Sequence, residues 1–179
     1  MNIIVNIILF QVGWFACVLS ASHQLEWLAL GSLAVIIAAH LYLVKNRQTE
    51  TSILLLAASV GIIVDSTLIS LNVFSASQTP SLPGLAPLWL IGLWALFGST
   101  LNHSLSWFRR HLWLAAMAGL VFAPLAYWSG HRLGALQFTN DYAHYWILLI
   151  IGSCWFFVTP LLLWLSQRLG REARALQHN

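Results

Sequence analysis

The 179-residue chain is too apolar and too poor in charge to be a water-soluble domain. Hydrophobic residues make up 59% of it and charged residues only 7%, whereas soluble domains carry about 25% charged residues. The formal net charge is +3, but the basic residues lie between apolar runs, where membrane topology explains them better than a nucleic-acid partner does. The composition therefore predicts a protein solvated by membrane lipids, and no nucleic acid is expected as a partner.

Six apolar runs follow one another along the chain, most of them close to the roughly 20 residues that a transmembrane helix needs. They cover residues 3–21, 26–44, 51–74, 87–107, 112–129 and 143–165. Each must be helical, because lipid cannot satisfy open backbone hydrogen-bonding groups. The fourth run opens with Pro87 in its first turn, where the missing N–H does no harm. The sequence predicts an all-α, polytopic membrane bundle of six transmembrane helices.

The distribution of basic residues predicts the orientation of this bundle. With six spans, seven of the eight Lys and Arg residues fall on one side of the membrane, and only Arg132 falls on the other. The seven are Lys45, Arg47, Arg109, Arg110, Arg168, Arg171 and Arg174. Because Lys and Arg accumulate in cytoplasmic loops, both termini are predicted to be cytoplasmic.

A polar tail of residues 167–179 follows the predicted transmembrane domain of residues 1–166. Apolar residues recur in it at helical spacing, with Arg168, Arg171 and Arg174 on another face. Such a segment could form a basic amphipathic helix that lies on anionic lipid headgroups. The alternative is a frayed, solvated end that only sets topology.

Asp65 is the clearest polar group inside a predicted span. A carboxyl group near the centre of a transmembrane helix costs about 2.5–3.5 kcal/mol on insertion scales, so it should face the bundle interior and have a partner. Groups at a similar depth are Gln11, Trp14, Trp94 and Tyr127. Asp65 could relay a proton or bind a substrate headgroup, or it could be a hydrogen-bonded clamp between helices.

A second polar group is expected near the cytoplasmic ends of the spans. His40 and His103 lie at matching depths, Glu50 sits at the same boundary, and Asn102 adjoins His103. Two histidines on separate spans could ligate haem or a metal ion, or they could bracket an anionic headgroup. Only Glu50 offers a third ligand, and packing at the interface is the simpler interpretation. No metal or other cofactor is therefore predicted.

Four residue patterns, spread over nearly the full length, carry a family resemblance. They are Phe10-Gln11-xx-Trp14-Phe15, Glu50 with Gly61-xxx-Asp65, Pro87-x-Trp89-xxxx-Trp94-xx-Phe97, and Gly119-xxxx-Pro124-xx-Tyr127-xx-Gly130. With these patterns the chain resembles a family of small bacterial inner-membrane proteins catalogued as a domain of unknown function. Members are often encoded beside enzymes that modify membrane fatty acids. The resemblance implies a multi-pass protein of the bacterial inner membrane that supports lipid modification or envelope stress, and it assigns no activity to any residue.

Three functions compete on these observations. A lipid-binding accessory protein for fatty-acid modification would need a lateral opening between helices, filled by an acyl chain. A small proton-coupled transporter or flippase would need a water-accessible path that reaches Asp65. An intramembrane enzyme acting on a lipid would need a second titratable group within hydrogen-bond reach of the first.

Overall fold

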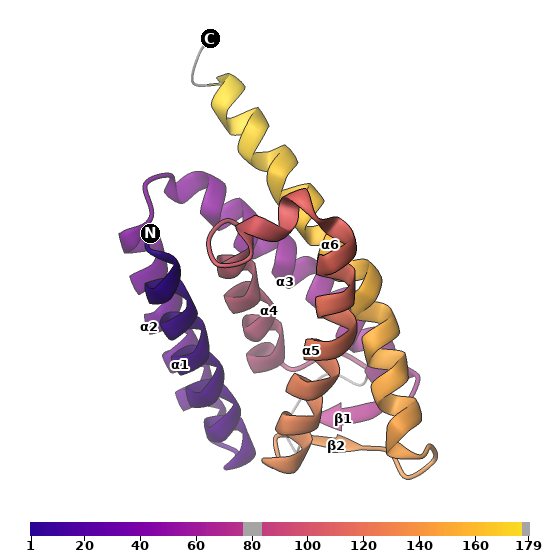
Figure 1. Ribbon diagram of the computed structural model, residues 1–179. Helices are drawn as coiled ribbons and strands as arrows, with labels where there is room; N and C mark the ends of the chain where they lie inside the picture. The colour runs from indigo at the N-terminus through magenta and orange to yellow at the C-terminus, as the bar shows by residue number, and fades with distance from the viewer. Residues whose placement is uncertain (77–83, 177–179) are drawn as a thin grey trace.

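The computed structural model describes residues 1–76 and 84–176, except for the side chains of 172–176. Over these residues the chain forms six α-helices, one 3₁₀ helix and two short strands (Figure 1). The elements are α1 (Ile3–Ser22), α2 (Glu26–Leu43), α3 (Arg47–Ser70), β1 (Phe74–Ala76), α4 (Leu88–Leu101), η1 (Ser106–Arg110), α5 (Leu112–Arg132), β2 (Leu136–Phe138) and α6 (His144–Leu176). The predicted all-α bundle is confirmed. All these α-helices except α4 are long and apolar enough to cross a membrane.

The fourth helix is shorter than predicted. The sequence placed a span over residues 87–107, but α4 ends at Leu101 after 14 residues, a length of about 21 Å at 1.5 Å per residue. The reason lies in α1, where the amide of Asn6 donates a hydrogen bond to the Ser99 carbonyl (3.0 Å) and accepts one from the Ser104 backbone N–H (3.1 Å). This buried amide takes up a carbonyl that a continuing helix would use itself, so the chain turns into η1.

Other helix boundaries also differ from the predicted ones. Helix α3 ends at Ser70 and not at residue 74, which begins β1, and α5 continues to Arg132, three residues beyond its predicted end. Helix α3 begins four residues earlier than the predicted span, because the Asn46 side chain caps it by accepting a hydrogen bond from the Thr49 N–H (3.1 Å). Helix α6 runs from His144 to Leu176 without a break, so the predicted tail begins as a continuation of the sixth helix. In this extension the Arg168 guanidinium lies 4.0 Å from the centre of the Trp164 ring. The Arg174 side chain lies outside the described residues, and headgroup binding by the tail stays a prediction.

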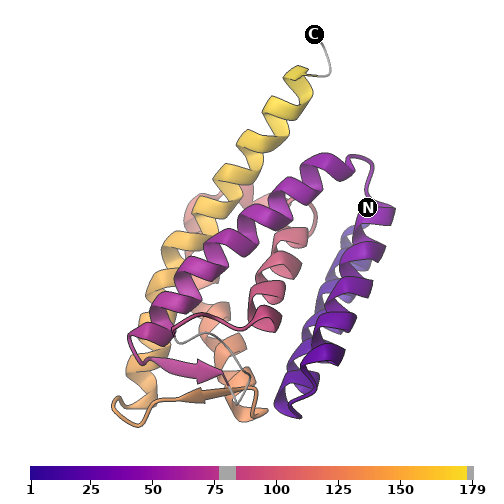
Figure 2. The same cartoon turned by 180° about the vertical axis from the view of Figure 1, so that it is seen from behind.

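The helices form two pairs on either side of α4. Helix α1 packs on α2, and both contact α4, whereas α5 packs on α6. Helix α3 packs along α4 and also contacts α6 (Figure 2). Both termini lie at the same end of the bundle, which also holds the α2–α3 connection (Figure 1). The shared end agrees with an even number of crossings, while its placement on the cytoplasmic side stays a prediction.

A small antiparallel sheet closes the opposite end of the bundle. The six predicted helices include no strand, but β1 and β2 pair here, with Phe74 opposite Phe138. Phe74, Leu136 and Phe138 are buried. The sheet therefore joins the end of α3 to the end of α5 and covers the apolar interior (Figure 1).

Close helix contacts depend on small residues. A Cβ at Gly98 of α4 would lie 2.9 Å from the Ala57 Cβ and 3.3 Å from the Ile53 carbonyl oxygen of α3. In lipid, where hydrophobic exclusion from water does not drive helices together, such small residues allow the backbone approach that gives van der Waals contact.

We expect Gly98→Ala to lower the free energy of unfolding by about 1–3 kcal/mol through overpacking against α3. Gly31→Ala is the matched control, since a Cβ at Gly31 in α2 meets nothing within 4 Å. The control should be neutral or slightly stabilising because Ala is the better helix former. Unfolding in mixed micelles with increasing denaturing detergent measures both. Equal effects of the two substitutions would contradict this account of α3–α4 packing.

Candidate functional site

Asp65 lies at the junction of three helices. Its side chain on α3 is 0% exposed. The Trp94 indole Nε1 of α4 donates a hydrogen bond to Oδ2 at 2.7 Å, and the Tyr127 hydroxyl of α5 donates one to Oδ1 at 2.6 Å. Two of the four partners expected from the sequence are therefore in contact with the carboxylate. Both oxygens have a donor, which is the arrangement that a buried charge requires.

Gly61 makes the Trp94 contact possible. It precedes Asp65 by one helical turn, so both residues lie on the same face of α3. A Cβ at Gly61 would lie 2.1 Å from Cγ of Trp94, which means that the indole occupies the space a side chain would fill. Trp94 also stacks on Trp155 of α6, with ring centroids 4.4 Å apart and an interplanar angle of 21°. The indole is thus fixed by packing as well as by its hydrogen bond.

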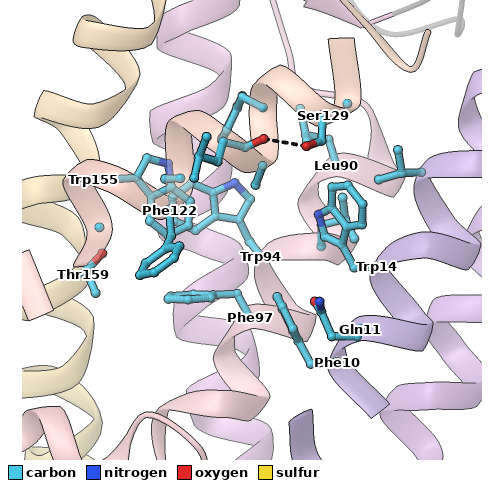
Figure 3. Close-up of a pocket in the computed structure, with 18 of the residues that line it drawn as sticks. Phe10, Gln11, Trp14, Leu90, Trp94, Phe97, Phe122, Ser129, Trp155 and Thr159 are labelled. Carbon is cyan, nitrogen blue, oxygen red and sulfur yellow. Dashed lines mark hydrogen bonds between the residues drawn. The ribbon is translucent and has the colours of Figure 1, made fainter. Parts of the chain in front are cut away.

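A cavity of about 530 Å³ adjoins this junction (Figure 3). Helices α1, α4, α5 and α6 line it, mostly with apolar and aromatic side chains. Trp94 and Tyr127 form part of its wall, whereas Asp65 is not one of the lining residues. The Asp65 carboxylate therefore lies outside the cavity, and its hydrogen bonds hold two of the lining residues, Trp94 and Tyr127, in place.

The other two expected partners have a different position. Gln11 and Trp14 of α1 line the cavity (Figure 3). In the described part of the chain no hydrogen bond joins either of them to Asp65. Sequence reasoning missed Phe122 and Trp155, which also line the cavity. Neither belongs to a recognisable pattern, and no signal in the sequence separates them from other aromatic residues of the spans.

The cavity opens sideways between α1 and α5. At its edge, Phe15 of α1 is 50% exposed, and Phe122 and Leu125 of α5 are 68% and 54% exposed. Both helices run along the long axis of the bundle (Figure 1). The exposed part of the lining therefore lies on the side of the bundle, between the ends of α1 and α5.

The second predicted group of polar residues also comes together, near the end of the bundle that holds the termini. Glu50 of α3 accepts a hydrogen bond from the Asn102 amide at 2.7 Å. His40 Nε2 lies 3.3 Å from Oε2 of Glu50, and His103 Nε2 lies 3.4 Å from Oε1. Arg109 donates to the Asn102 side-chain oxygen and to the Leu101 carbonyl. Glu50 thus connects α2, α3 and the turn after α4.

These helices, their apolar outer surfaces and their buried polar junctions define a multi-pass membrane protein. The chain belongs to the family described as "Protein of unknown function (DUF2878)", whose model matches residues 3–161. The expected membership of a family of unknown function is therefore confirmed, while the bacterial inner membrane stays a prediction. No curated protein and no solved structure shows a significant match to the chain.

The Asp65 junction predicts a measurable loss of stability on removing one hydroxyl. We expect Tyr127→Phe to lower the free energy of unfolding by about 1–3 kcal/mol, because a buried carboxylate oxygen loses its donor. Tyr145→Phe is the matched control, since Tyr145 is 61% exposed. In a double-mutant cycle with Asp65→Asn, the two losses should not add. Additive losses would show that the hydroxyl and the carboxyl act independently, against the geometry described above.

Proposed function

We propose that the protein binds a membrane lipid by taking one acyl chain into the cavity between α1 and α5, and that it serves as an accessory protein for reactions on membrane fatty acids. The observation that carries this proposal is the sideways mouth, edged by Phe15, Phe122 and Leu125. A cavity that opens to hydrocarbon is filled by what surrounds it, and in a bilayer the surrounding groups are acyl chains.

The lining supports an elongated apolar occupant. The cavity volume of about 530 Å³ falls within the roughly 300–1,000 Å³ of small-molecule sites, which are lined mainly by apolar and aromatic groups with a few polar ones. Trp155 stacks on Trp94 and meets Phe97 edge to face, so the three rings present a rigid surface. Since lipid tails are as apolar as the protein wall, selectivity here must come from shape and van der Waals fit.

Gln11 gives the cavity one hydrogen-bonding group near the middle of α1. Within the described residues its amide makes no hydrogen bond. An unmodified acyl chain has no atom that can form a hydrogen bond with this amide, whereas a chain that carries an oxygen atom could form one. The amide therefore supports discrimination between chains that differ in chemical modification, which is what an accessory protein of fatty-acid modification needs.

The buried position of Asp65 lends little support to a proton-coupled transporter. The carboxylate is 0% exposed, and both of its oxygens already accept hydrogen bonds, so its surroundings fit a clamp better than a group that exchanges protons with water. An intramembrane enzyme gains more support, because Tyr127 is a second titratable group 2.6 Å from Asp65 and also lines the cavity. We keep it as the second candidate. It predicts that Tyr127→Phe abolishes turnover of a bound lipid while leaving lipid binding intact.

Photo-crosslinking tests the acyl-chain proposal. The full chain is reconstituted in nanodiscs with a phospholipid that carries a photoreactive group on its acyl chain, and labelled residues are mapped by mass spectrometry. Labels should concentrate on the parts of α1 and α5 that line the cavity. Ala118→Trp, which fills the cavity from α5, should lower this labelling several-fold. Ala38→Trp, on the exposed face of α2, should leave it unchanged.

Labels spread evenly over all outward-facing helix surfaces, or labelling of α1 and α5 that Ala118→Trp leaves intact, would contradict acyl-chain binding. The accessory role has its own test, a comparison of lipid extracts from cells with and without the gene. Unchanged fatty-acid composition under envelope stress would count against that role while leaving lipid binding itself standing.

A further inference from the structure

His40, Glu50 and His103 direct three ligand atoms toward one point in the bundle. They come from α2, from α3 and from the turn after α4, and the two nitrogens and one carboxylate oxygen all lie within 4.8 Å of one another. We propose that these three side chains bind a divalent transition-metal ion, of which Zn²⁺ and Fe²⁺ fit the donor set best. This site is separate from the acyl-chain cavity, because none of the three residues lines that cavity.

The distances around Glu50 are compatible with coordination of one metal ion. His40 Nε2 makes a long hydrogen bond of 3.3 Å with Oε2 of Glu50. His103 Nε2 lies 3.4 Å from Oε1, beyond the roughly 2.7–3.2 Å that N–H···O hydrogen bonds usually span. Ligand atoms bound tetrahedrally to one zinc ion at about 2.0–2.1 Å are separated by about 3.3–3.4 Å. Each nitrogen lies at this spacing from a different carboxylate oxygen, His40 from Oε2 and His103 from Oε1. With one ligand atom taken from each residue, the three atoms lie within 4.8 Å of one another, so side-chain rotations would have to bring them to the tetrahedral spacing.

A buried nitrogen without a hydrogen bond points to the same site. Among the described residues, His103 Nε2 is buried and makes no hydrogen bond, although it faces Glu50. Buried polar atoms in native structures nearly always have a partner. The imidazole side chains of His40 and His103 are only 1% and 13% exposed, so water is a poor substitute. A metal ion between the three side chains would satisfy this nitrogen.

Residues around the three ligands hold the carboxylate in place. The Asn102 amide donates to Glu50 Oε1 at 2.7 Å, and Arg109 in turn donates to the Asn102 side-chain oxygen. Ligating carboxylates are commonly oriented by such outer hydrogen bonds. Two histidines and one carboxylate leave coordination positions open, as in zinc enzymes with a His₂Glu set and in non-haem iron sites. The sequence placed the two histidines at one depth, and the fold brings Glu50 between them.

Metal titration of the full-length protein in detergent tests the site. After treatment with a chelator, the protein is titrated with Zn²⁺ in a calorimeter, and bound zinc is counted by elemental analysis. We expect one zinc ion per chain. His103→Gln and Glu50→Gln should each weaken binding by about 100-fold, and Asn102→Ala by about 10-fold, since outer-shell losses typically cost about 10–100-fold.

A second histidine pair supplies the matched control. The rings of His131 and His144 lie 5.3 Å apart, the same separation as the rings of His40 and His103, but no carboxylate joins them in a metal-binding group within the described residues. His144→Gln should therefore leave zinc affinity unchanged. Near-ultraviolet circular dichroism of the tryptophans shows whether each variant is folded.

The visible absorption of bound Co²⁺ gives a second readout that depends on the ligands themselves. A folded wild-type protein that binds neither Zn²⁺ nor Co²⁺ would overturn the proposal. So would zinc affinity that His103→Gln and Glu50→Gln leave unchanged, or a Co²⁺ spectrum that changes with His144→Gln and not with His103→Gln.

Discussion

A carboxylate buried in a bundle that lipid surrounds must receive hydrogen bonds from other helices, and the arrangement of α3, α4 and α5 follows from this constraint. Asp65 has no water to solvate it, and an unpaired charge in such a place costs several kcal/mol. Trp94 and Tyr127 meet this need from two different helices. Any movement of α4 or α5 away from α3 would break one of these bonds, so the carboxylate fixes the relative positions of all three.

The same junction shapes the cavity. Trp94 must point toward α3 to reach Asp65, and Gly61 leaves the space for it. Held in this way, the indole cannot turn to fill the volume between α1 and α5. The hydrogen bond from the Tyr127 hydroxyl to Asp65 restrains the tyrosine side chain in the same way. A polar interaction inside the bundle thus maintains an apolar hollow that opens on the side of the bundle.

Two further polar groups join helices near the end of the bundle that holds the termini. Asn6 joins α1 to the end of α4, and Glu50 joins α2, α3 and the turn that follows α4. Because α4 stops early at Leu101, the chain after it can place Asn102 and His103 beside Glu50. The early end of α4 therefore makes the polar cluster possible, because a helix that continued to residue 107 would direct Asn102 and His103 away from Glu50.

The sequence by itself determined the membrane-spanning class, the positions of five long helices and the burial of Asp65, because hydrocarbon imposes length, apolarity and pairing on every segment that crosses it. It also placed Trp94 and Tyr127 at the right depth. Depth alone cannot tell which helices are neighbours, so it could not separate these two true partners from Gln11 and Trp14. The early end of α4, the sheet between β1 and β2, and the approach of Glu50 to both histidines were decided by contacts between segments far apart in the chain. Such contacts depend on how the side chains of different helices fit together. The hydrophobic periodicity of a single segment does not predict them.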